Sequence, residues 1–356
     1  MSSFHLIRAL RGQDNRRCKL DSSHDLPNFD RAEINQVLKR YQQPDAWRSA
    51  WQLANTLLPN LALLYLMYLS LQVSYLLTLA LSVLTAGFMA RTFIIFHDCG
   101  HGSFFKSRKA NEVTGIICGI LTLTPYHYWR HSHAMHHATA GDLDRRGTGD
   151  VMTLTVEEFR SLSRLRQWYY RAFRHPLTLF TYGAFLNFTV GHRFYKPGTG
   201  LRERRSVLYT NLILAALIAG IIALIGWKAY LMIHVPVVFF MSSIGVWMFY
   251  VQHNFEGTYW ERHDNWDYFR AGLQGSSFYR LPRVLQWFTG NIGFHHIHHL
   301  NSRIPNYFLP RCYRENPIFH VRPLTLRSSL RSLRLRLWDE KSKGMVGFEA
   351  LKSWSS

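Results

Sequence analysis

The sequence contains few cysteines, and they are not arranged to bind metal or to form a disulfide framework. Its four cysteines, Cys18, Cys99, Cys118 and Cys312, lie far apart and form no CxxC pair. This spacing argues against a zinc finger, a ferredoxin-type cluster and a disulfide scaffold. A nucleotide-binding GxGxxG motif is also lacking. Any metal must therefore be bound by nitrogen and oxygen ligands, and any electrons must come from an external carrier.

Acidic residues are also scarce. The chain has 22 Asp and Glu against 42 Lys and Arg, a formal charge of +20. Such a charge suits nucleic acid, an anionic membrane surface or an acidic protein. Because the basic stretches lie beside long apolar runs, we expect lipid and an acidic protein as partners and no nucleic acid. The first residues, MSSFHLIRALRGQDNRRCK, lack the apolar core of a secretory signal, which predicts a basic cytosolic tail.

Four apolar runs are long enough to cross a bilayer, which needs roughly 20 helical residues. They predict transmembrane helices in two hairpins, at residues 53–72, 73–96, 206–227 and 229–252. Residues 113–126 are too short to span comfortably, and residues 176–195 contain polar and charged side chains. We expect both stretches to be re-entrant, interfacial or buried in the protein. The pattern predicts an all-α integral membrane protein with a cytosolic helical domain.

Basic residues predict the orientation and the two ends of the chain. Residues 97–206 and both tails are rich in Arg and Lys, whereas the hairpin turns have almost none, which places the tails in the cytoplasm. Residues 1–52 are interpreted as a cytosolic tail with an interfacial amphipathic helix, marked by Ile34, Val37, Leu38 and Tyr41. Residues 53–310 form the predicted main domain.

The C-terminal residues 311–356 are predicted to form a basic amphipathic tail. Leu326, Leu330, Leu333 and Leu337 share one helical face, interleaved with arginines. This pattern favours either a helix on an anionic lipid surface or an ordinary helix packed on the cytosolic domain.

Histidines are concentrated in three short motifs. HDCGH holds a pair four residues apart, and HAMHH and HHIHH share the spacing HxxHH. Because residues at i, i+3 and i+4 share a helical face, each motif presents two or three imidazoles in one direction. All three follow or lie between apolar runs on the predicted cytoplasmic side. They predict a metal site built from His97, His101, His133, His136, His137, His295, His298 and His299, with His253 in VQHNF as a ninth candidate.

The ligand set narrows the chemistry. Imidazoles without thiolates suit iron, copper or zinc better than magnesium or calcium, and eight histidines are too many for one metal. A membrane zinc protease would need HExxH, but here Asp98 follows His97. A transporter would want ionisable groups near the bilayer midplane, where the runs offer few beyond Arg91 and His234. Redox chemistry on an apolar substrate is favoured. A metal transporter or sensor, and a structural protein with incidental histidines, are the alternatives.

Longer motifs resemble a known family. HDCGHGSFF, HHATAGDLDRRGTGDV, VQHNFEGTYW and GNIGFHHIHHLNSRIPNY are similar to the histidine boxes of membrane fatty acid desaturases, in the acyl-lipid branch of bacteria and plastids. The resemblance covers about residues 50–310. It implies a di-iron centre bound by the nine histidines, O₂ as co-substrate, lipid acyl chains as substrate and a bacterial plasma membrane. Acyl hydroxylases, epoxygenases and carotenoid-modifying oxygenases share the ligand set and are the nearest alternatives.

Further residues are predicted to support these ligands. Metal-binding histidines usually donate their other N–H to a carboxylate or carbonyl, and nearby acids are the candidates: Asp98, Asp142, Asp144 and Asp150. Asn291 is expected to bond to a metal-bound water. The acidic electron donor, ferredoxin or flavodoxin, is expected to dock on a basic surface that contains Arg145, Arg146, Arg160, Arg164 and Arg166.

Overall fold

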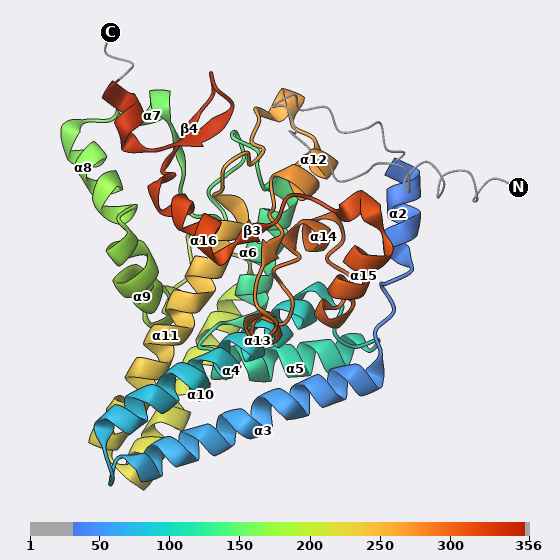
Figure 1. The fold of residues 1–356 in the computed structure, drawn as a ribbon. Coiled ribbons are helices and arrows are strands. Elements are labelled where there is room, and N and C mark those ends of the chain that lie inside the picture. Colours follow the sequence, from blue (N-terminus) through green and yellow to red (C-terminus); the bar gives the residue numbers. More distant parts are fainter. Residues whose placement is uncertain (1–30, 353–356) are drawn as a thin grey trace, which may run out of the picture. The chain divides into compact units, whose positions relative to one another are not determined.

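The structure is a computed structural model that describes residues 31–352 (Figure 1). The chain divides into two units, residues 1–39 and residues 40–356. In the first unit α2 covers Arg31–Lys39, with Glu33 in its first turn and Lys39 in its last, which complements the helix dipole. The amphipathic helix predicted in residues 1–52 therefore ends at Lys39, before Tyr41. Residues 26–30 lie outside the described part, and residues 40–45 are not helical.

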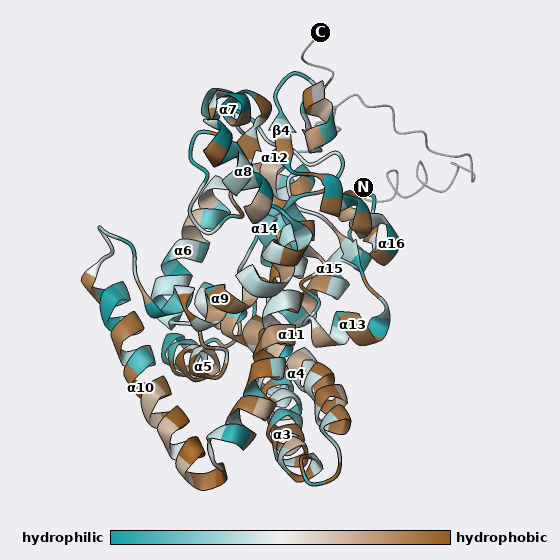
Figure 2. Cartoon of the chain, turned by 90° about the vertical axis from the view of Figure 1, so that its left-hand side faces the viewer, coloured by the Kyte–Doolittle hydropathy of each residue, from teal (hydrophilic) through white to brown (hydrophobic). Residues whose placement is uncertain are grey.

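In the described part of the second unit, residues 40–352, four helices are long and apolar enough to cross a membrane. They are α3 (Ala46–Ser70), α4 (Tyr75–His101), α10 (Leu201–Ile225) and α11 (Trp227–His253), which form two hairpins and confirm the predicted fold class. Figure 2 shows apolar residues along all four. Both hairpin turns lie at the lower end in Figure 1, and the C-terminal ends of α4 and α11 point the other way.

The helix ends differ from the ends of the apolar runs. α4 continues five residues beyond the predicted span, to His101, and stops at Gly102, whose φ of 69° is left-handed. α3 begins seven residues earlier than predicted, because the Asp45 side chain accepts a hydrogen bond from Arg48 N. Hydropathy predicts where a helix meets lipid, but capping groups decide where it ends.

The remaining elements lie between and after the hairpins. The helices are α5 (Arg108–Leu121), α6 (Tyr126–Thr139), α7 (Val156–Ser161), α8 (Arg164–Phe173), α9 (Gly183–Thr189), α12 (Tyr268–Gln274), α13 (Arg283–Phe288), α14 (His295–Leu300), α15 (Leu309–Glu315) and α16 (Leu326–Ser329). A π-helical turn at Thr178–Tyr182 precedes α9. The short strands are β1 (Leu154–Thr155), β2 (Tyr279–Arg280), β3 (Leu324–Thr325), β4 (Leu337–Asp339) and β5 (Gly344–Val346).

The C-terminal amphipathic helix predicted from the leucine spacing is wrong. α16 ends at Ser329, residues Leu330–Arg334 form a 3-10 turn, and Leu337 begins β4. β4 pairs in parallel with β1 and antiparallel with β5. Leu337 and Trp338 are fully buried there. Burial of Leu337 in a small sheet overrides the helical spacing, whereas Leu326 and Leu330 remain exposed.

A buried arginine joins the spans to the site region. Arg91 lies within α4, and its Nε donates to Thr56 Oγ1 of α3 at 3.0 Å. Its guanidinium also donates to the Trp287 carbonyl and stacks on that ring, 3.9 Å from the centroid. A charge inside a membrane helix is tolerated only when such partners satisfy it. Arg91 thereby ties α3 and α4 to the segment that leads into α14.

Candidate metal centre

The histidines converge at the ends of α4 and α11, between α6 and α14. They form two groups within which the ligand nitrogens all lie within 4.8 Å of one another. The first group contains five residues, His97, His101, His133, His137 and His298, and the second contains four, His136, His253, His295 and His299. Together they are the nine histidines predicted from the sequence, brought together from four helices.

Each group contains nitrogens at the spacing expected of ligands that share one ion. His137 Nε2 lies 3.2 Å from His133 Nε2 and 3.1 Å from His298 Nε2. In the second group His253 Nε2 lies 3.1 Å from His136 Nε2 and 3.0 Å from His295 Nε2. Metal–nitrogen bonds of about 2.1 Å with neighbouring ligands at right angles require a separation of about 3 Å. The donor set therefore fits two metal ions.

Burial keeps these imidazoles in the form that binds metal. Burial, followed by the neighbouring imidazoles, lowers the pKa of His133, His137, His295, His298 and His299 well below the usual value. A neutral ring offers a lone pair to a metal. His101 Nε2 and His299 Nε2 are buried without a hydrogen-bond partner among the described residues. Unpaired nitrogens in a buried site are costly unless an ion satisfies them.

Two of the predicted acids contact the histidines. Asp98 Oδ1 lies 3.1 Å from His97 Nδ1, and Asp150 hydrogen bonds to His136 Nδ1. Asp98 Oδ2 also accepts from Asn306 N at 2.7 Å and from Asn306 Nδ2 at 2.8 Å. One carboxylate thus joins the first histidine motif to the segment that follows α14.

The other two acids do not contact the histidine groups, so their prediction is wrong. Asp142 accepts from Arg145 Nε at 2.6 Å and faces His263 Nδ1 at 2.9 Å. Asp144 accepts from Arg262 Nη1 at 2.6 Å and from His263 N. Both acids fix a surface loop. Sequence proximity to a motif did not indicate where their carboxylates point.

Asn291 occupies a turn immediately before α14. Its φ of 59° is left-handed, and its side chain accepts from Gln286 Nε2 at 3.2 Å. This contact gives Asn291 a role in turning the chain into the third histidine motif. Its predicted bond to a metal-bound water stays a prediction.

Several contacts around the site were not expected from the sequence. Gln52 Nε2 donates to Asn306 Oδ1 at 3.1 Å, which extends the Asp98 network to α3. Trp129 stacks on His133 with ring centroids 4.3 Å apart. Gly100, inside HDCGH, leaves little room for a side chain, because the Trp129 ring lies 3.1 Å from the position of a Cβ. In the sequence, the only sign of a structural role for Gln52 is that it is a polar residue next to a long apolar run.

The histidines outside the two groups have other roles. His296 Nε2 lies 3.0 Å from the Phe319 carbonyl oxygen, and His127 Nε2 lies 3.2 Å from Glu112 Oε1. His131 is exposed. His175, His192, His234, His263 and His320 also belong to neither group, and His5 and His24 lie outside the described residues.

An apolar cavity of about 670 Å³ reaches both histidine groups. His97 and His133 of the first group and His295 of the second line it, beside Asp150. Its other walls are mainly apolar side chains from α4, the π-helical turn, α9 and α11, including Phe93, Ile94, Leu179, Phe188, Met241, Ile244 and Met248. These features define a helical membrane protein with two buried histidine groups that could hold metal ions and that adjoin an apolar cavity.

Comparison with known proteins gives the family. A family model described as fatty acid desaturase matches residues 73–324. The chain is 47% identical over 321 residues to a fatty acid desaturase of Bacillus subtilis (strain 168), which covers 90% of this chain and 91% of that protein. This chain belongs to the fatty acid desaturase family, whose enzymes are oxidoreductases.

More distant relatives carry more specific names. The chain is 30% identical over 234 residues to the sn-1 acyl-lipid omega-3 desaturase (ferredoxin) of Synechocystis sp., which covers 62% of this chain and 61% of that protein. It is 28% identical over 242 residues to an omega-3 fatty acid desaturase, endoplasmic reticulum, of Vigna radiata var. radiata, with 61% and 58% covered. The prediction of a desaturase fits these relatives better than a hydroxylase, epoxygenase or carotenoid oxygenase.

Proposed function

We propose that this enzyme inserts a cis double bond into a lipid-linked acyl chain and reduces O₂ to water. Two adjacent methylenes each lose one hydrogen, and two electrons and two protons enter from outside, so that one O₂ yields two waters. Two irons, when bound by the two histidine groups, would supply the reactivity of O₂ toward unactivated C–H bonds. We assign His97, His101, His133, His137 and His298 to one ion and His136, His253, His295 and His299 to the other.

The observation that supports this proposal is the apolar cavity that ends at both histidine groups. A wall made of Phe93, Ile244 and Met248 binds methylenes without distinguishing them. The position of the double bond is then set by how far the chain enters. The protein contributes binding, orientation and exclusion of water, whereas the cofactor supplies the chemistry.

Asp98 and Asp150 hold the ligand rings in place. Each accepts a hydrogen bond from the Nδ1 of one histidine, which leaves Nε2 of that ring to face the metal position. Asn306 keeps the Asp98 carboxylate oriented by donating twice to its other oxygen. This network fixes the tautomer and angle of His97 before an ion binds.

We propose an acidic carrier, ferredoxin or flavodoxin, as the electron donor, because one relative's name includes ferredoxin. The predicted basic surface is smaller than the sequence indicated, since Arg145 pairs with Asp142 and Arg146 pairs with Glu158. Arg164 and Arg166 at the start of α8 are exposed beside Trp168, which is 66% exposed. We expect Arg166→Gln to raise the KM for reduced ferredoxin severalfold at low salt, and an unchanged KM would exclude this face.

We also propose that the chain lies in a bacterial plasma membrane with both termini and the histidine motifs on the cytoplasmic side. The basic residues on the loops at the histidine end support this orientation through the positive-inside rule. Residues 53–310 are proposed as the catalytic domain, and residues 1–52 as a cytosolic tail.

Product analysis tests the function. The gene would be expressed in a host that lacks desaturases but supplies ferredoxin and its reductase, and fatty acids would be analysed by gas chromatography–mass spectrometry. We expect a new monoene or diene, absent from a His298→Ala strain. Hydroxy or epoxy acids would move the assignment to an oxygenase. An unchanged profile with iron-loaded protein and a competent donor would contradict an acyl substrate.

A further inference from the structure

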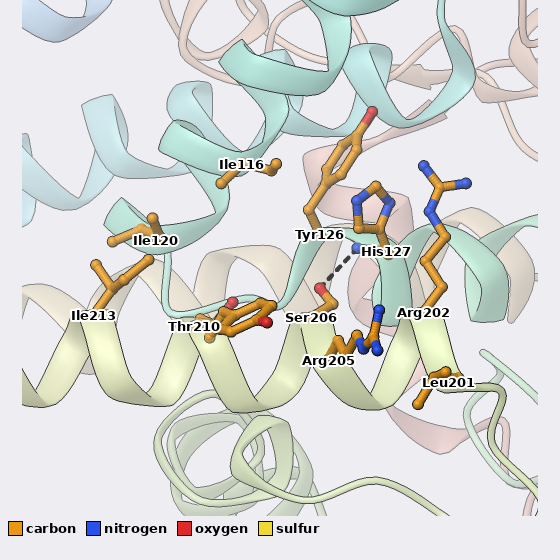
Figure 3. A pocket seen from close by; sticks show the side chains of 11 residues that line it. Ile116, Ile120, Tyr126, His127, Leu201, Arg202, Arg205, Ser206, Thr210 and Ile213 are labelled. Atoms are coloured by element: carbon orange, nitrogen blue, oxygen red, sulfur yellow. Dashed lines mark hydrogen bonds between the residues drawn. The ribbon is translucent and has the colours of Figure 1, made fainter.

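A second cavity, of about 500 Å³, lies between α5, α6 and α10 (Figure 3). It shares no lining residue with the apolar cavity that reaches the histidine groups, here called the acyl cavity. It is lined by Ile116 and Ile120 of α5, Tyr126 and His127 of α6, and Leu201, Arg202, Arg205, Ser206, Tyr209, Thr210 and Ile213 of α10. The cavity therefore lies between the membrane-spanning helix α10 and the first turn of α6, the helix that carries the second histidine motif.

One end of this cavity is polar and has an unbalanced positive charge. Arg202 Nη2 lies 2.9 Å from Glu112 Oε1, so these two charges offset one another. Arg205 has no ion pair or hydrogen-bond acceptor among residues 31–352. Ser206 Oγ accepts from His127 N at 3.0 Å, which leaves its hydroxyl hydrogen available to donate. Figure 3 shows Arg202, Arg205, Ser206 and His127 gathered at this end.

The other end is apolar and faces the lipid. Ile116, Ile120 and Ile213 lie together there in Figure 3. Ile213 lies eight residues after Arg205, which is about 12 Å along the helix axis. Only 11% of the most apolar stretch of α10 is buried in the protein. This face of the groove therefore continues into the lipid-facing surface of the span. A free anion would leave the isoleucine end unfilled.

The charge and the apolar wall match one class of ligand. Arg202 and Arg205 lie in the first turns of α10, at the end of a predicted span, where lipid phosphates lie. We propose that this cavity binds an anionic phospholipid that is not the substrate, with its phosphate at Arg205 and Ser206 and an acyl chain along Ile116 and Ile213. A phosphodiester carries one negative charge, which equals the charge left unpaired.

Such a lipid would connect α10 to the metal site. Tyr126 forms part of the cavity wall, and its hydroxyl donates to the Cys99 carbonyl of α4 at 2.7 Å. Gly115 of α5 has no room for a side chain, because the Tyr126 ring occupies the position of a Cβ. The first turn of α6 is thus held by α4 and α5 on one side and by the lipid and α10 on the other. Its histidines follow within three turns.

Lipid titration of the purified full chain in neutral detergent tests the site without any turnover, so it is independent of the proposed reaction. The probes are phosphatidylglycerol, phosphatidylcholine with the same chains, and inorganic phosphate, and the readout is the thermal unfolding midpoint. We expect saturable stabilisation by phosphatidylglycerol. Arg205→Gln should weaken its apparent affinity about tenfold, the effect of losing one charge-assisted hydrogen bond.

Two further variants separate the site from general charge and folding effects. Arg108→Gln removes an exposed arginine of α5 that does not line the cavity, and should change the affinity less than twofold. Ile116→Trp should weaken binding by filling the apolar end. Unchanged binding by Arg205→Gln, or an equal loss in Arg108→Gln, would overturn the proposal. So would equal stabilisation by phosphatidylcholine, which indicates a neutral groove, or by inorganic phosphate, which indicates a free-anion site.

Discussion

His136 and His137 are adjacent in the chain, yet their imidazoles belong to different histidine groups. His136 Nε2 lies 3.1 Å from His253 Nε2, whereas His137 Nε2 lies 3.1 Å from His298 Nε2. The two rings are inclined by 81°. Successive residues of a helix point about 100° apart, so α6 contributes to both histidine groups from one turn. α14 does the same with His298 and His299.

This division predicts selective metal loss. His136→Ala should remove one iron of two and abolish desaturation, because the second group retains only three histidines. Iron per chain, measured by mass spectrometry on purified protein, should fall to about one. His131→Ala, an exposed residue on the same helix, is the matched control and should retain both irons. Full iron content in His136→Ala would contradict the assignment of ligands to two groups.

The Asp98 network predicts a graded effect on metal retention. Asp98→Asn keeps the shape but loses the charge that orients the His97 ring, and loss of such a contact costs about 10–100-fold in metal affinity. Iron release to a chelator should accelerate accordingly. Asp144→Asn, which alters a surface ion pair with Arg262, should release iron at the wild-type rate. Equal rates in the two variants would show that Asp98 does not support the site.

Gly245 offers a test of the acyl cavity. It lines the cavity from α11, and nothing lies within 4 Å of the position of its Cβ. Gly245→Leu should therefore project into the cavity, shift the products toward shorter chains or another double-bond position, and lower turnover about tenfold or more. Gly220→Leu, at an equally open position on α10 outside the cavity, should leave the product profile unchanged. The same profile in both variants would place the acyl chain elsewhere.

His192 predicts a dependence of stability on pH. Burial, followed by the charge of Arg193, lowers the pKa of His192 to about 4, below its unfolded value. Between pH 6.5 and 4 the unfolded chain therefore binds more protons than the folded chain, and stability falls as the pH falls through this window. Between pH 7 and pH 4, the free energy of unfolding should therefore fall by about 1–3 kcal/mol less in His192→Gln than in the wild type. Denaturation in detergent at the two pH values measures the difference, and parallel losses would contradict it.

Periodicity was a good guide wherever a segment is decided by its own residues. The four spans follow from runs of apolar residues, and eight of the nine histidines follow from the spacing of the three motifs, whereas His253 stands alone in the sequence. Periodicity failed for Leu337, which lies in β4 and not in a helix, because its partner strand is 183 residues earlier, at Leu154. Proximity in the sequence failed for Asp142 and Asp144, because their partners Arg262 and His263 are more than 100 residues away.

The sequence by itself predicted that the chain spans a membrane, that imidazoles are the ligands of any metal and that eight histidines are too many for one metal. These are properties of composition and local spacing. Only the tertiary structure decided which histidine joins which group, since a helix such as α6 presents its residues to two sides and its neighbours choose between them. The contact between Asp98 and Asn306 and the two cavities are likewise visible only in the tertiary structure. Contacts between distant segments depend on packing that no local pattern encodes.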